Sequence, residues 1–331
     1  METTGAGAAT SADKALFATT DWSLLAIISL IWGSAFLWTA IALEGFSAEA
    51  VAFLRISLGA AGLALIPSAR RRIDREDWPK LLVVAFAGNA GPALLFANAI
   101  ETVDSAVAGM SVSAVPLASL FIWLLLNRTL PASIQVLGLI IGLAGVALMA
   151  APNLAGSEAS PAGIGLLALA TLGYAITQNV IAPLQRKYGS TAVIFWALVV
   201  GSVGLLPLGL TGSHNLTMNA RSIVAIVILG VIATGLARSL AALLTGRVGA
   251  VRGAVHAYFI PVLAVVFGVV LLGEKLTPLE LIGLPITLAG GYLVTLRDSP
   301  TMMRMHRLNR PPASRNIWSS DIKSRRPMSW L

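Results

Sequence analysis

The sequence predicts an all-α, polytopic membrane protein with ten transmembrane helices arranged as two inverted five-helix repeats. Three observations predict this fold: the composition, a series of long apolar runs, and a set of landmarks that occurs twice. Of the 331 residues, 56% are hydrophobic and 11% are charged, and the mean hydropathy is +0.83. This is too little charge to surround a water-soluble core of that size, so the chain belongs in lipid.

The apolar runs are long enough to cross a bilayer as helices. Each run lasts roughly 17 to 22 residues, which as a helix spans a hydrocarbon layer of about 30 Å. The runs do not alternate between polar and apolar residues as barrel strands do. Ten runs are predicted, approximately at 22–43, 48–67, 81–100, 105–126, 134–151, 162–182, 192–210, 222–243, 251–272 and 279–296.

The second five runs repeat the landmarks of the first five in the same order. The first repeat is predicted at residues 22–151 and the second at residues 162–296. Because five is an odd number, the second repeat enters the membrane from the opposite side, which makes it inverted. A duplicated membrane unit indicates a transporter whose site lies between its halves. The matched landmarks are Leu24-Leu25-Ala26 with Leu166-Leu167-Ala168, Trp32 with Tyr174, Phe53 with Phe195, Gly59 with Gly201, Gly88 with Gly230, Pro116 with Pro261, and Gly138 with Gly283.

Lys and Arg gather in the segments that share a side with the N-terminus, whereas the opposite loops hold only Arg221 and Lys275. Positively charged loops stay cytoplasmic, so both termini of this multi-pass protein are predicted to face the cytoplasm across an inner or plasma membrane. Residues 1–21 show no cleavable signal and are predicted to be a disordered N-terminal segment, with the first helix acting as its own insertion signal.

The basic character of the chain follows from this topology. Residues 297–331 are too polar to pack a core and are predicted to be a basic, disordered cytoplasmic tail, either solvated or resting on anionic lipid. The net charge of +8 therefore does not indicate nucleic acid as a partner. The absence of Cys excludes disulfides, thiolate metal sites and Cys nucleophiles. No cofactor and no metal are predicted, and no residue settles an oligomeric state.

Four motifs occur in a characteristic order. They are IWGSAF at 31–36, Arg55 in the second run, Pro116 in the fourth, and LGEKLT at 272–277 ahead of the tenth. With these motifs on a duplicated ten-helix layout, the chain resembles the EamA-type branch of the drug/metabolite transporter superfamily over about residues 22–296. The resemblance implies a ten-helix bundle with a central cavity, and export or uptake of small metabolites by alternating access. Amino acids, nucleotide precursors, sugars and drugs are substrates of such transporters.

Two positions depart from the pattern of that family. Thr129 is the first-half counterpart of Glu274, where many relatives carry Glu in both places, and this weakens a mechanistic role for Glu274. Arg238 stands in the eighth run where an aromatic residue is frequent in the family. The second departure indicates a cavity chemistry particular to this protein.

The ionisable side chains within the runs are all potentially cationic. They are Arg55, Arg238, Arg252 and His256, and no Asp or Glu lies near the middle of any run. Such groups cost several kcal/mol in a membrane unless they are paired or face water, so they are functional candidates. A cavity lined by Arg favours carboxylate or phosphate and repels lipophilic cations. The prediction is transport of an anionic or zwitterionic metabolite, with amino acids first.

Each cationic residue also has a structural interpretation. Arg55 matches a position that is commonly Arg in the resembled family, and it could pair with backbone carbonyls or with Glu101 or Asp104. Arg252 and Arg238 could reach lipid headgroups from near the helix ends. A lone intramembrane His such as His256 is more often a neutral helix contact than a proton shuttle.

Polar and aromatic side chains near the middle of the runs either bind ligand or hold helices together. Trp32 and Tyr174 stand out because repeat-related positions both carry large rings with a polar atom, although packing at the pseudo-twofold axis explains them too. Thr177 and Asn179 belong to the same polar set. The residues predicted to bind substrate are Trp32, Ser34, Asn89, Asn98, Tyr174, Gln178, Arg238, His256 and Tyr258.

Pro116 and Pro261 occupy equivalent places in the fourth and ninth runs, where each removes a backbone hydrogen bond and bends its helix. They are predicted hinges, or else static bends that shape the cavity. The spacing of Gly138 and Gly142 allows close helix approach, and similar small residues recur in the tenth run.

The sequence thus predicts a small-molecule transporter in the lipid bilayer, with an exporter of drugs or toxic lipophilic compounds as the alternative. An intramembrane enzyme is a remote alternative, since HExxH, GxSxG and clustered Asp, Glu and His are missing from the runs.

Overall fold

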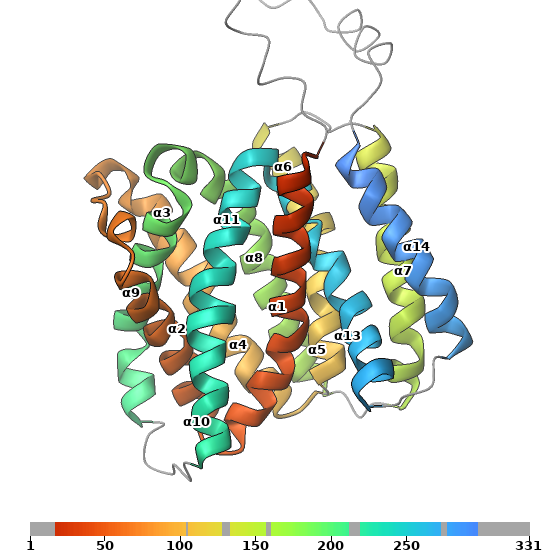
Figure 1. The fold of residues 1–331 in the computed structure, drawn as a ribbon, viewed down its shortest axis with the longest axis horizontal. Helices are drawn as coiled ribbons and strands as arrows, with labels where there is room; N and C mark the ends of the chain where they lie inside the picture. The colour runs from red at the N-terminus through yellow and green to blue at the C-terminus, as the bar shows by residue number, and fades with distance from the viewer. Residues whose placement is uncertain are drawn as a thin grey trace, which may run out of the picture. The chain divides into compact units, whose positions relative to one another are not determined.

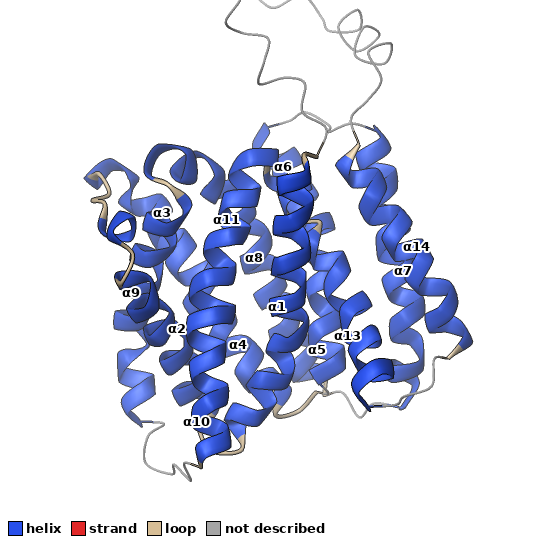
Figure 2. Ribbon diagram, in the orientation of Figure 1, coloured by secondary structure: helices blue, strands red, loops and turns tan. Residues whose placement is uncertain are grey.

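The computed structural model describes residues 17–103, 105–127, 133–156, 160–211, 219–272 and 277–296. Throughout these ranges the regular structure is helical, with no strand (Figure 2). This confirms the predicted all-α fold. The segments predicted to be disordered, residues 1–21 and 297–331, lie wholly or largely outside the described residues. Four single residues discussed above also lie outside them: Asp104, Thr129, Glu274 and Lys275.

The first half of the chain forms helical rods over each of its five predicted runs. Two of the rods consist of consecutive helices of different pitch, and two short 3₁₀ turns, η1 (Pro67–Arg70) and η2 (Arg75–Asp77), connect the second rod to the third. The helices are α1 (Thr19–Leu43), α2 (Ala48–Ala64), α3 (Trp78–Ala85) with η3 (Phe86–Ala90) and α4 (Gly91–Ile100), α5 (Ser105–Ser111) with η4 (Val112–Ala114) and α6 (Val115–Asn127), and α7 (Ser133–Gly156).

The second half repeats this pattern. Its helices are α8 (Pro161–Tyr188), α9 (Ser190–Thr211), α10 (Ala220–Val227) with η6 (Ile228–Leu236) and α11 (Ala237–Val248), the short α12 (Ala250–Gly253), α13 (His256–Leu272) and α14 (Pro278–Thr295). Figure 1 shows α1, α11 and α10 running along the bundle side by side, with α7 and α14 paired at one edge.

Among the described residues, eight helical stretches are long and apolar enough to cross a membrane. The stretch at 250–263 is a shorter apolar helix, and α2 has 17 residues. Large apolar side chains such as Leu37, Phe121 and Leu125 are more than half exposed, which fits surfaces that face lipid tails. The multi-pass membrane fold is confirmed, and a count of ten spans stays a prediction.

The two halves run in opposite directions. The Asp21 carboxylate at the start of α1 pairs with Arg247 at the end of α11. Arg186 at the end of α8 donates to the carbonyl of Gly246, the neighbour of Arg247, over 3.3 Å. The start of α1 and the end of α8 therefore lie at the same end of the bundle. Because these helices are the first of each repeat, the arrangement is inverted as predicted.

Basic side chains cluster at this same end, which we call the basic end. Of the described residues it includes Arg70, Arg71, Arg72, Arg75, Lys80, Arg186, Lys187 and Arg247, whereas the opposite end has Arg221 paired with Glu44 over 3.5 Å. The asymmetry is the one used to predict orientation. The side of the membrane that the basic end faces remains a prediction.

Helices α7 and α14 pack closely through glycines. A Cβ added to Gly138 would lie 2.7 Å from the carbonyl oxygen of Gly290, and one added to Gly283 would lie 2.6 Å from that of Gly145. A Cβ at Gly142 would meet the Tyr258 ring at 2.6 Å. The sequence prediction of close approach at Gly138 and Gly142 is confirmed.

The two predicted hinge prolines lie near breaks in their rods. Pro116 follows the 3₁₀ turn η4, and Pro261 is inside α13, which begins directly after the interruption between α12 and α13. One static arrangement shows bends and not motion, so a hinge role for either residue stays a prediction.

Candidate functional site

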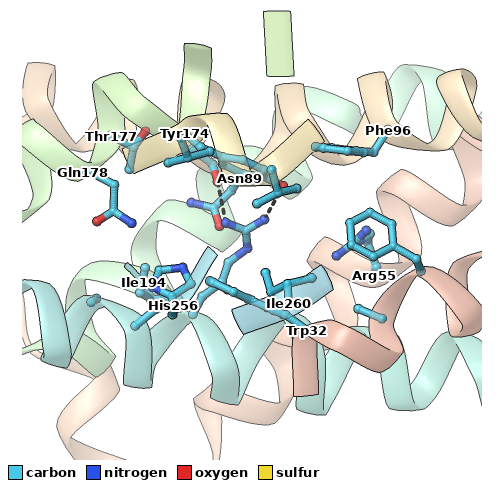
Figure 3. A pocket seen from close by; sticks show the side chains of 18 of the residues that line it. Trp32, Arg55, Asn89, Phe96, Tyr174, Thr177, Gln178, Ile194, His256 and Ile260 are labelled. Atoms are coloured by element: carbon cyan, nitrogen blue, oxygen red, sulfur yellow. Dashed lines mark hydrogen bonds between the residues drawn. The ribbon is translucent and has the colours of Figure 1, made fainter. Parts of the chain in front are cut away.

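A pocket lies between the two halves. It has about 920 Å³ of empty space, including the part open to solvent (Figure 3). Its walls come from α1, α2, η3, α4, η4, α6, α8, α9, α11 and α13. Of the predicted binding residues, the pocket gathers Trp32, Asn89, Tyr174, Gln178, Arg238 and His256. Residues from distant parts of both repeats thus converge on one space, as expected of a transporter built from repeats.

Two π-helical segments occur beside this space: η3, which contributes Gly88 and Asn89 to its walls, and η6, which directly precedes α11. They hold Gly88 and Gly230, the repeat-related glycines. In each segment a polar side chain bonds the carbonyl five residues earlier: Asn89 Nδ2 donates to Val84 over 2.7 Å, and Thr234 Oγ1 donates to Leu229 over 2.8 Å. Such segments are rare and occur frequently at functional sites.

Arg238 is tethered across the pocket. Its Nη1 donates to the Gly88 carbonyl over 2.6 Å, and its Nη2 donates to the Tyr174 hydroxyl over 3.1 Å, drawn as dashed lines in Figure 3. Its Cζ lies 5.2 Å from the centre of the Tyr174 ring and 5.9 Å from that of Trp32. The guanidinium is fixed between the repeat-related rings, and its buried Nε has no partner in the described part of the chain.

Arg55 enters the same pocket from α2. It is 8% exposed, and its Nε donates to Thr234 Oγ1 over 3.2 Å, the single hydrogen bond of this side chain within the described ranges. Of the partners considered for Arg55, Glu101 is exposed and forms no ion pair with it, and Asp104 lies outside the described residues. Sequence reasoning left Arg55 out of the binding set, although its charge within a span was a usable signal.

His256 and Trp32 support each other. Their ring centres are 4.9 Å apart, and Trp32 Nε1 donates to the Ala233 carbonyl over 2.8 Å. His256 is buried, with Nδ1 2.7 Å from the Gly253 carbonyl. Since a carbonyl can only accept, this nitrogen carries the proton. The arrangement favours His256 as a helix contact rather than a proton shuttle.

An aromatic wall completes the pocket. Tyr174 stacks on Phe96 with ring centres 5.9 Å apart, and Phe96 meets Phe36 edge-on at 5.7 Å. The sequence did not reveal Phe36 and Phe96, because an apolar ring in an apolar helix carries no distinguishing signal. Gln178 Oε1 is occupied by the Thr245 hydroxyl at 2.8 Å.

Three predicted binding residues lie outside the pocket. Ser34 and Asn98 bond backbone carbonyls of their own helices, those of Ile31 and Leu94. Tyr258 is fully buried, and its hydroxyl donates to the Leu139 carbonyl over 2.7 Å, so it joins α13 to α7. The structure thus gives all three hydrogen bonds to backbone carbonyls, and none of them is among the residues that line the pocket.

No carboxylate lines the pocket among the described residues, and neither Arg55 nor Arg238 forms an ion pair with a described acid. Two further buried polar atoms on the pocket wall lack partners there, Asn89 Oδ1 and Thr177 Oγ1. The one group of three close carboxylates in the described ranges, Asp74, Glu76 and Asp77, lies at the basic end with Lys187 bound to all three.

Comparison with known proteins decides the family. The profile of the EamA-like transporter family matches residues 21–151 and again 161–296. The chain belongs to the EamA-like transporter family. The double match agrees with the repeat found within the sequence, and membership makes the protein an integral, multi-pass membrane transporter of a small molecule.

Curated relatives of this EamA-family protein bear transporter names. An uncharacterized transporter of Archaeoglobus fulgidus is 28% identical over 82% of this chain and 98% of its own. YdfC of Bacillus subtilis, also an uncharacterized transporter, is 29% identical over 78% and 86%. A probable terminal-alkyne amino-acid exporter of Streptantibioticus cattleyicolor is 24% identical over 83% and 93%.

A solved crystal structure shares the fold. It superposes with a TM-score of 0.65 and 16% sequence identity, covering 88% of this chain and 99% of that one. At this identity the likeness shows the fold alone.

Proposed function

We propose that this protein moves small carboxylate-bearing solutes, amino acids first among them, across the membrane by alternating access. The observation that carries the proposal is the charge of the pocket. Arg55 and Arg238 line it, and no acid from the described residues accompanies them. A fixed positive charge in a low-dielectric space attracts anions and excludes cations.

Arg238 is preorganised to hold a carboxylate. A guanidinium has five N–H donors, and the bonds to Gly88 and Tyr174 engage two of its nitrogens while Nε has no described partner. Nη1 and Nη2 each keep a second N–H, and a carboxylate in the pocket can accept hydrogen bonds from this pair. Because the protein already holds the side chain in place, little ordering is left to binding.

Two acceptors in the same pocket favour amino acids among carboxylates. Asn89 Nδ2 is committed to the Val84 carbonyl, which leaves Oδ1 without a partner, and Thr177 Oγ1 is also unpartnered. Both oxygens are buried, so an ammonium group can donate to them only when the two side chains turn toward it. The name of the Streptantibioticus relative, an amino-acid exporter, supports the same substrate class.

The inverted halves support alternating access. The pocket draws its walls from both repeats, and the Arg238–Gly88 bond crosses from one to the other. In transporters of this design one repeat rocks against the other around a central site.

A second candidate function has an observation of its own. The wall formed by Trp32, Phe36, Phe96 and Tyr174 would suit lipophilic compounds, as in an exporter of drugs or toxic molecules. Such an exporter selects by size and hydrophobicity, and replacing Arg238 has little effect on its flux.

The test is flux through purified protein in liposomes. Labelled amino acids and organic anions are compared with lipophilic cations, with Arg238→Ala beside wild type and Arg221→Ala as a control arginine outside the pocket. We expect carboxylate flux that Arg238→Ala lowers by roughly 10- to 100-fold, since a hydrogen bond to a charged group contributes about 1.5–3 kcal/mol. Cation flux that is unchanged in Arg238→Ala would overturn the proposal and leave the drug exporter.

A further inference from the structure

The pocket holds two guanidinium groups in distinct settings. Arg238 is tied to Gly88 and Tyr174, while Arg55 is tied to Thr234 in η6. In Figure 3, Arg55 and Phe96 lie toward one end of the pocket, and Thr177 and Gln178 lie toward the other. The two cationic side chains come from separate rods, α11 and α2, and line one continuous space.

Arg55 is held by its inner nitrogen and keeps its outer ones unused. Its Nε donates to Thr234, whose own hydroxyl donates to the Leu229 carbonyl within η6. These two consecutive hydrogen bonds fix the direction of the Arg55 side chain. Neither terminal amino group of Arg55 has a hydrogen-bond partner among the described residues, so both are available to an anion in the pocket that Arg55 lines.

The charges of this pocket are unbalanced. Arg55 and Arg238 line the same pocket, and the polar side chains beside them include Asn89, Thr177 and Gln178, which carry no charge. Two like charges in a buried space are unfavourable unless each meets an opposite charge. A single carboxylate balances one guanidinium and leaves the other uncompensated.

We infer that the preferred substrate carries two carboxylates, one for Arg55 and one for Arg238. The substrate class is a small dicarboxylate, dicarboxylic amino acids included. This inference rests on the proposed function of the same pocket and narrows it, because a transporter of monocarboxylic amino acids uses one arginine only. Arg55 is then a specificity-determining residue that touches substrate.

The experiment compares each diacid with its monoamide, which has nearly the same shape and one charge fewer. The pairs are aspartate with asparagine, glutamate with glutamine, and succinate with succinamate. Initial rates are measured with purified, full-length protein in liposomes. We expect wild type to transport the diacid of at least one pair roughly tenfold faster or more than its monoamide. The reason is that bidentate, charge-assisted hydrogen bonds are among the strongest hydrogen bonds in proteins.

Variants of Arg55 test whether this residue binds the second carboxylate. In Arg55→Gln the rate for the diacid is expected to fall to within about twofold of the rate for its monoamide. Arg221→Gln, which removes an exposed arginine far from the pocket walls, keeps the wild-type ratio. If Arg55→Gln does not fold, Arg55→Lys retains the charge and is expected to retain the preference, and the wild-type ratio stands on its own.

The outcomes separate this inference from the proposed function. Equal wild-type rates for diacid and monoamide in all three pairs overturn the two-carboxylate inference and leave carboxylate transport intact. A preference that survives in Arg55→Gln overturns the role of Arg55. If none of these solutes moves and lipophilic cations do, the proposed function itself fails.

Discussion

At the scale of single residues, the position of the Arg238 charge is set by its two tethers. One is a backbone carbonyl, that of Gly88, and the other is the Tyr174 hydroxyl. The ring of Tyr174 also faces the guanidinium at 5.2 Å. Replacing Tyr174 by Phe therefore removes the hydrogen bond to Arg238 and keeps the aromatic ring.

Tyr174→Phe tests this tether. The variant keeps the ring and loses the hydroxyl, so the guanidinium is less fixed, and we expect the apparent KM for a transported carboxylate to rise roughly five- to tenfold. Tyr292→Phe is the matched control, because Tyr292 is 55% exposed on α14 and stacks on Trp22 away from the pocket. An unchanged KM in Tyr174→Phe would show that the tether does not position the charge.

Residues also show where sequence reasoning succeeds. The repeat places Trp32 and Tyr174 at equivalent positions, which predicts a shared role, and both line the pocket. Polar groups in apolar helices need partners, which is the basis for predicting Ser34, Asn98 and Tyr258 as binding residues, and in the structure their partners are backbone carbonyls. A uniformly apolar helix does not reveal which of its faces meets lipid, a neighbouring helix or a cavity.

At the scale of the helices, the closeness of α7 and α14 depends on glycine. The added Cβ of an alanine at 138 would lie 2.7 Å from the Gly290 carbonyl oxygen and from the Val294 nitrogen. Backbone atoms at that distance cannot turn aside as a flexible side chain can. The helices must therefore separate to admit a methyl group.

Gly138→Ala is expected to destabilise the protein. Overpacking of this kind costs about 1–3 kcal/mol, so the midpoint of thermal unfolding in detergent should fall. Gly165→Ala is the control, because a Cβ at this exposed position of α8 meets nothing within 4 Å. At this position Ala, which has a higher helix propensity than Gly, should stabilise the protein by about 0.5–1 kcal/mol. Equal effects of the two substitutions would contradict the close contact.

Elements explain part of what the sequence could not predict. The apolar runs located the rods, because length and hydropathy are enough to identify a spanning helix. Length and hydropathy do not reveal the π-helical segments η3 and η6. The wider turn of a π-helix rotates the side chains that follow it relative to those of a continuous α-helix. Which side chains of α4 and α11 face the pocket depends on that rotation.

At the scale of the whole molecule, a polar network joins the two halves at the basic end. Lys187 at the end of α8 lies 2.9 Å from Asp74, 3.2 Å from Glu76 and 2.8 Å from Asp77, all in the link between α2 and α3. The Tyr188 hydroxyl lies 2.8 Å from Asp74. Hydrogen bonds from Lys187 first, and then from Tyr188, hold the pKa of Asp74 below its ordinary value.

This network predicts a dependence on acid. A carboxyl whose folded pKa is lowered stabilises the protein above its unfolded pKa, about 3.9 for Asp, and that contribution is lost as the pH falls through the folded value. We expect Lys187→Gln to lower the unfolding midpoint modestly at pH 7 and the gap from wild type to close below about pH 4. Arg75→Gln makes the same charge change beside the network and should show no closing gap. A gap that is constant with pH would contradict this account.

The molecule-scale features follow from the sequence more fully than the site does. The repeat, the inverted arrangement and the clustering of basic residues at one end could all be predicted, since duplication, an odd number of runs and loop charge are properties of the chain as a whole. The joint presence of Arg55 and Arg238 in one pocket could not, because it depends on how α2 packs against η6 in space.

The most direct test of the central claim, that this pocket selects a carboxylate, is the rate at which wild-type protein in liposomes moves an amino acid compared with its α-carboxamide. The two solutes have nearly the same shape and differ in the group that Arg238 is proposed to hold. The account predicts that the amino acid moves faster by roughly tenfold or more. Equal rates for the two solutes, or faster movement of the cationic amide, would contradict it.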